Sequence, residues 1–72
     1  MENHKINRVS EAKEWVNDIK DNRRDFEAAH VLEDELYLKV LRGIADGTCE
    51  DPQQVAKEAI KTQNISFPRY CA

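Results

Sequence analysis

The pattern of segment 22–47 predicts one long helix with an unusually wide apolar surface. On a helical wheel of about 100° per residue, one face collects Phe26, Ala29, Leu32, Leu36, Val40, Leu41 and Ile44. A second stripe, offset from the first, consists of Val31, Leu38 and Ala45. A helix that is apolar over so much of its circumference must be contacted from two sides. The rest of the chain, or a second copy of it, therefore has to pack around this helix.

Length and composition indicate one small folded domain. The chain has 72 residues, of which 40% are hydrophobic and 35% charged, and this balance is typical of a folded rather than a disordered protein. A chain of this size buries only about 60% of the surface that its unfolded form exposes, so its core is small. Partners or self-association often supplement cores of this kind.

Charge and hydropathy exclude some classes of function. The net charge is −3, whereas a general duplex-DNA binder needs a basic surface, so direct nucleic-acid binding is not expected. No apolar run approaches the roughly 20 residues of a membrane span, and the polar first residues do not resemble a signal peptide. Cys49 and Cys71 lack metal-ligand spacing, so we expect free thiols in a cytoplasmic protein.

Start and stop signals divide the first part of the chain. Residues 1–9 are expected to be a frayed lead-in. Ser10 is the predicted N-cap of a first helix over residues 10–21, whose apolar stripe is Ala12, Trp15, Val16 and Ile19. Asp21 and Asn22 favour a break before a second helix over residues 23–46, with Asn22 as its candidate N-cap and with one continuous helix as the alternative.

The second part of the chain has the clearest signals. Gly47 suits the left-handed end of a helix, and Asp51 and Pro52 are typical of an N-cap and a first helical position. A third helix is therefore predicted over residues 52–63. The tail 64–72 is too apolar for a free end because it contains Ile65, Phe67 and Tyr70.

These segments predict an all-α fold, a compact three-helix domain with a long central helix and an extended C-terminal tail packed on it. The expected core is Trp15, Phe26, Leu32, Leu36, Val40 and Ile44. The second stripe of Val31, Leu38 and Ala45 is an expected interface, since the small residues of the third helix leave part of it uncovered. Phe67 and Tyr70 are further interface candidates, and a homodimer is an open alternative.

The candidate binding residues lie on the long helix. Glu33 falls near the middle of the apolar face, with His30 three positions before it and Tyr37 four after it, so the three can touch. A buried carboxylate needs partners, and the favoured interpretation is a satisfied structural network. The alternative is a ligand site with a shifted pKa. Asp34 belongs to an acidic run that is either solvated surface or a docking patch for a basic protein.

Motifs for metal binding, DNA reading and catalysis are weak. Glu27 and His30 match the Glu-x-x-His spacing of di-iron bundles, but facing carboxylates are lacking from the expected apolar surfaces. Segment 52–66 is similar to the first half of a helix-turn-helix, but a recognition helix does not follow it. No catalytic constellation is evident, so we expect neither enzyme activity, nor a metal, nor a cofactor.

Four short motifs carry a resemblance. They are Ala-His-x-x-Glu-Asp at 29–34, Ile-Ala-Asp-Gly at 44–47, Ala-Lys-x-Ala-Ile-Lys-Thr at 56–62 and Ile-Ser-Phe-Pro-Arg-Tyr-Cys-Ala at 65–72. Over residues 26–72 the chain resembles small uncharacterised all-helical proteins of bacteria and their phages. The resemblance implies an accessory or host-interaction role and no catalytic residues.

The expected function is a non-enzymatic protein-interaction module, such as an accessory regulator that binds a host protein. One alternative is a metal- or small-ligand-binding helical protein that uses His30, Glu33 and Tyr37. The other is a transcription-associated regulator that acts through a protein partner. The sequence names no partner.

Overall fold

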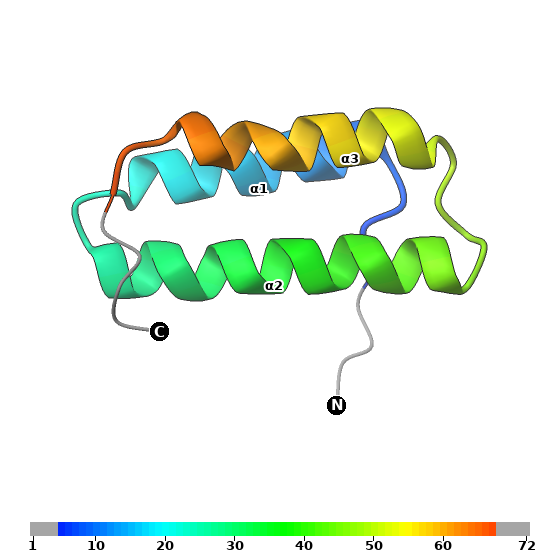
Figure 1. Ribbon diagram of the computed structural model, residues 1–72, viewed down its shortest axis with the longest axis horizontal. Coiled ribbons are helices and arrows are strands. Elements are labelled where there is room, and N and C mark those ends of the chain that lie inside the picture. The colour runs from blue at the N-terminus through cyan, green and yellow to red at the C-terminus, as the bar shows by residue number, and fades with distance from the viewer. Residues whose placement is uncertain (1–4, 68–72) are drawn as a thin grey trace.

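Three helices, each antiparallel to its neighbour in the chain, make up the computed structural model, which describes residues 5–67 (Figure 1). Helix α1 spans Val9–Asp21, α2 spans Phe26–Ala45 and α3 spans Pro52–Ile60, and a 3₁₀ turn, η1, follows at Lys61–Asn64. Helices α1 and α3 contact each other and both pack on α2. The predicted all-α three-helix domain is confirmed. Within residues 5–67, no helix is both long and apolar enough to cross a membrane.

The break between α1 and α2 is real, but the predicted caps are shifted. Helix α1 begins at Val9 with Arg8 as its N-cap, so the prediction of Ser10 was wrong. The Asn22 side chain donates to the Asp18 carbonyl at 2.8 Å, and it therefore closes α1 rather than opening α2. Asp25 caps α2 instead, because its carboxylate accepts from the Ala28 N–H at 3.3 Å.

Glycine and proline end α2 and start α3 as predicted. Gly47 has φ +75°, a left-handed conformation that a residue without Cβ adopts at no steric cost. The Asp51 carboxylate accepts from the Gln54 N–H at 3.3 Å, and Pro52 occupies the first helical turn. Helix α3 ends at Ile60, three residues before the predicted end, because the chain tightens there into η1.

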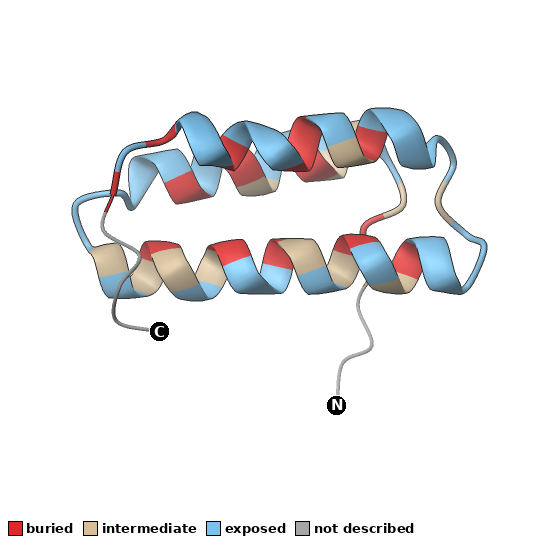
Figure 2. Cartoon of the chain, viewed as in Figure 1, coloured by how far each residue is buried: buried red, intermediate tan, exposed pale blue. Residues whose placement is uncertain are grey.

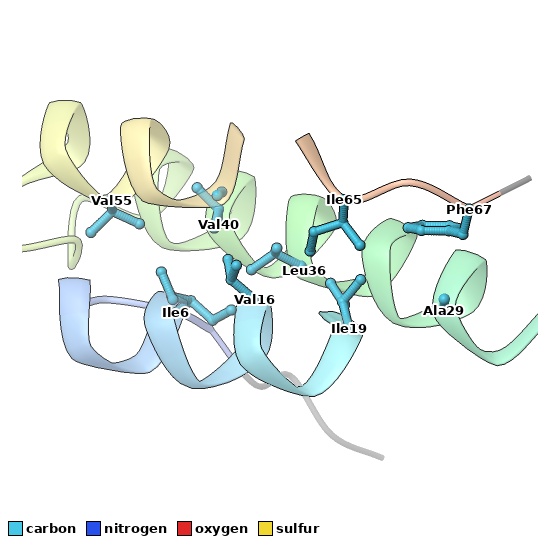
Figure 3. Packing of buried hydrophobic residues seen from close by; sticks show 11 residues of the cluster. Ile6, Val16, Ile19, Ala29, Leu36, Val40, Val55, Ile65 and Phe67 are labelled. Carbon is cyan, nitrogen blue, oxygen red and sulfur yellow. The ribbon is translucent and has the colours of Figure 1, made fainter. Parts of the chain in front are cut away.

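The core lies between α2 and the layer of α1 and α3 (Figure 2). Leu36 is fully buried and points into the space where Val16, Val40 and Ile65 also point (Figure 3). The other buried apolar side chains are Ile6, Ala12, Ile19, Ala29, Val55, Ala59 and Phe67. Three predicted core residues, Trp15, Phe26 and Leu32, are partly buried against this cluster. The prediction for Ile44 was wrong, since it is 40% exposed.

The described part of the lead-in, residues 5–8, packs against the helices and contributes Ile6 to the core, contrary to the expectation of a frayed segment. Ile6 is fully buried, and its N–H donates to the Lys39 carbonyl at 3.2 Å. The Asn7 carbonyl accepts from the Glu50 N–H at 2.8 Å. The lead-in therefore crosses α2 and is tied to the loop that precedes α3.

The tail packs on the helices as predicted, as far as it is described. Ile65 and Phe67 are buried and belong to the hydrophobic cluster. Tyr70 lies outside the described residues. The buried part of the tail closes the end of the bundle at which α1 ends and α2 begins (Figure 1).

Candidate functional site

A polar cluster lies where α2 meets η1. The Tyr37 hydroxyl shares a hydrogen bond with the Thr62 hydroxyl and accepts another from the Gln63 side-chain amide at 2.8 Å. Glu33 is 96% buried, and its Oε2 lies 3.5 Å from both Tyr37 Oη and Gln63 Nε2. The predicted burial and hydrogen bonding of Glu33 are confirmed, and Gln63, which is 30 positions away in sequence, supplies part of its environment.

His30 does not join this cluster. Its Nδ1 lies 3.3 Å from Asp34 Oδ2, and the Asp34 side chain is 69% exposed. The four predicted binding residues therefore form two pairs, Glu33 with Tyr37 and the partly buried His30 with the exposed Asp34. Sequence spacing alone did not separate them, because positions three and four apart on a helix can touch in several combinations.

The polar cluster is suited to structure more than to chemistry. Glu33 meets hydrogen-bond donors from two elements, so its carboxylate joins α2 to η1. Within residues 5–67, no group of three His, Cys, Asp or Glu side chains is arranged to hold a metal ion. No buried side-chain polar atom in the same range lacks a hydrogen-bond partner. The cluster is thus a satisfied network that links two parts of the chain.

An apolar groove lies beside this cluster, between α2 and α3. It has a volume of about 370 Å³ and is lined by Tyr37, Val40, Leu41, Ile44, Ala56, Ala59 and Ile60. Leu41 and Ile60 are 61% and 59% exposed on its rim. Such large apolar side chains around one groove are typical of a surface that binds a protein or ligand.

The small residues of α3 are the cause of the groove. Ala56 and Ala59 face α2 where larger side chains would reach Leu41 and Ile44. The side of α2 that faces α3 is therefore only partly covered, and Ile44 remains exposed for this reason. The small residues of the third helix were expected to leave part of the second stripe uncovered, but their effect on Ile44 was not predicted, because the wheel of α2 placed Ile44 on the core side.

The predicted interface stripe continues this surface along α2. Val31 and Leu38 are 55% and 48% exposed, and Ala45 is also exposed. Phe67 is buried in the core instead, so it is not part of this exposed surface. We call the exposed residues Val31, Leu38, Leu41, Ile44, Ala45 and Ile60 the apolar face.

A second, polar hollow of about 600 Å³ lies between the C-terminal ends of α1 and α3. Its lining includes Lys20, Arg23 and Lys61. Lys61 pairs with the buried Glu58 at 2.9 Å, and an Arg23 guanidinium N–H donates to the Lys20 carbonyl at 2.7 Å. Cations at helix C-termini stabilise the helix dipole, and this accounts for the basic character of the hollow.

The apolar face is thus the candidate functional site. The polar cluster lies beside its groove, since Tyr37 belongs to both. Comparisons with protein-family models, with curated proteins and with solved structures found no match for this chain.

Proposed function

We propose that this protein is a non-enzymatic protein-interaction module that binds a helix of its partner against the apolar face. The observation that carries the proposal is the open groove between α2 and α3, whose rim exposes Leu41 and Ile60. A groove lined by apolar side chains from two antiparallel helices accepts the apolar side of a third helix. The accessory role that the sequence resemblance implies stays a prediction.

The energetics favour a partner for this surface. Fully burying a leucine or isoleucine side chain contributes about 1.5–3 kcal/mol, and Leu41, Ile44 and Ile60 are each at least 40% exposed. The core beneath these side chains is small, so they have few apolar neighbours other than residues of α2 and α3. A bound helix would supply the apolar neighbours that Ala56 and Ala59 do not.

A ligand site at His30, Glu33 and Tyr37 is less well supported. Glu33 and Tyr37 already contact Gln63 and Thr62, while His30 contacts Asp34. His30 thus contacts the exposed Asp34, whereas Glu33 and Tyr37 contact residues that follow α3.

The test is capture of partners by the tagged protein from a lysate of cells that also express the untagged chain. Leu41→Glu places a charge on the apolar face, and Lys13→Glu adds an acidic group on the exposed side of α1 as a matched control. We expect the parent and Lys13→Glu to retain the same defined protein, identified by mass spectrometry, and Leu41→Glu to lose it. Circular dichroism checks that each variant is folded. Retention of the same proteins by all three would refute the role of this face.

A further inference from the structure

We propose that the partner helix is α2 of a second copy, packed antiparallel against the apolar face around a twofold axis between Leu38 and Leu41. This inference rests on the proposed interaction function and names its partner. Three properties of α2 support it: the spacing of its exposed side chains, the position of Asp34, and the charges beside the stripe.

The exposed side chains of α2 have the spacing of a coiled-coil seam. A stripe along α2 consists of Val31, Asp34, Leu38, Leu41 and Ala45, which follow one another at alternating intervals of three and four positions. All five are exposed, so the stripe lies on the side of α2 that α1 and α3 leave open. A repeat of 3.5 residues keeps such a stripe facing another helix along its length. A second helix with the same repeat is therefore its natural complement.

Asp34 decides the direction of the second helix. In a parallel, in-register pair, the two Asp34 carboxylates would meet at the seam, and like charges there are unfavourable. In the antiparallel pair, Leu38 packs on Leu41 of the second copy, and Asp34 lies opposite the small Ala45. The carboxylate then keeps access to water and to His30, which it already contacts at 3.3 Å.

The side of the stripe away from α3 is complementary in charge. Glu35 and Arg42 lie on this side, seven positions apart. The twofold axis brings Arg42 of each copy to nearly the same height as Glu35 of the other, so two ion pairs form across the seam. Glu35 is half exposed beside Lys39, and within residues 5–67 Arg42 forms no ion pair.

The side of the stripe towards α3 is apolar. The same axis places Tyr37 of one copy near Ile44 of the other, beside Ile60 on the rim of the groove. One arrangement therefore covers Leu38, Leu41 and Ile44 of both helices and pairs the charges on the opposite side. An isologous contact of this kind uses the same surface on both copies and closes as a dimer.

Charge reversal tests both the dimer and its direction. Arg42→Glu and Glu35→Lys each place like charges opposite one another twice in a homodimer, whereas an equimolar mixture of the two variants restores both attractive pairs. Sedimentation equilibrium from micromolar to millimolar concentration should show a dimer for the parent and for Lys13→Glu. Each charge variant alone should associate at least about tenfold more weakly, and the mixture should recover association.

Two results would overturn the proposal. The first is a parent that stays monomeric at millimolar concentration. The second is a dimer whose association the charge variants leave unchanged, or weaken without recovery in the equimolar mixture. A monomeric parent that still captures another protein through Leu41 leaves the interaction function standing. Capture of no protein at all removes both.

Discussion

At the residue scale, the most informative side chain is Glu33. It is a carboxylate on the side of α2 that faces the core, and it is 96% buried. The structure places the Tyr37 hydroxyl and the Gln63 amide beside it, each 3.5 Å from Oε2. These long contacts come from both α2 and η1, so Glu33 helps to position the turn that leads into the tail.

Truncating Glu33 should therefore destabilise the fold more than neutralising it does. Glu33→Ala removes an acceptor from the partly buried hydrogen bonds with Tyr37 and Gln63 and should lower the free energy of unfolding by about 1–3 kcal/mol. Glu33→Gln keeps the shape and an acceptor oxygen, so its effect should be clearly smaller. Urea unfolding measures both, with Glu14→Ala on the exposed side of α1 as the control. Equal stability of Glu33→Ala and the parent would show that the cluster contributes nothing.

At the element scale, the lead-in and α2 meet at Gly43. A Cβ on Gly43 would lie 2.7 Å from the Ile6 carbonyl oxygen and 2.8 Å from Asn7 Oδ1. The absence of a side chain is what lets the lead-in cross the helix so closely. Ion pairs of Lys5 with Asp46 at 2.8 Å and of Arg8 with Glu50 at 3.3 Å flank this crossing.

Gly43→Ala should consequently reverse the usual effect of such a change. In an open helix, alanine is about 1 kcal/mol more favourable than glycine. Here the added methyl group meets backbone atoms of Ile6, so we expect a loss of about 1–3 kcal/mol. In a chain that lacks residues 1–7, the same substitution should stabilise the protein. Thermal melts compare the full chain and the shortened chain, each with and without Gly43→Ala. An equal effect of the substitution in both would contradict the close contact between the lead-in and Gly43.

At the scale of the whole molecule, segments from both ends complete the core. Ile6 and Phe67 are both buried, although they are separated by nearly the whole described chain. Three short helices enclose little apolar volume by themselves. Together the two segments increase the buried surface, and within residues 5–67 the large apolar side chains that stay exposed all belong to the apolar face.

Phe67→Ala should accordingly be strongly destabilising. Removing a buried phenylalanine ring costs about 3–5 kcal/mol, which is a large part of the stability of a small domain. Ser66→Ala, at the exposed neighbouring position, should leave stability nearly unchanged. Denaturant unfolding followed by Trp15 fluorescence compares them. Similar midpoints for both variants would mean that Phe67 does not pack in the core in solution.

The sequence by itself determined the fold class and the turn between the last two helices. Apolar periodicity specified three helices, and Gly47, Asp51 and Pro52 specified the turn between the last two, because these signals act within a few residues. The burial of Glu33 also followed from its place on the wheel of α2. Local signals were less decisive at Ser10 and Asn22, where several polar residues compete for the same capping role.

Only the tertiary structure decided which apolar surfaces are covered. Ile6 is buried because Gly43 admits the lead-in, and Ile44 is exposed because Ala56 and Ala59 are too small to reach it. The partners of Glu33 in η1 are likewise set by how α3 ends. Each of these outcomes depends on a pair of residues far apart in sequence, and a helical wheel describes one helix at a time.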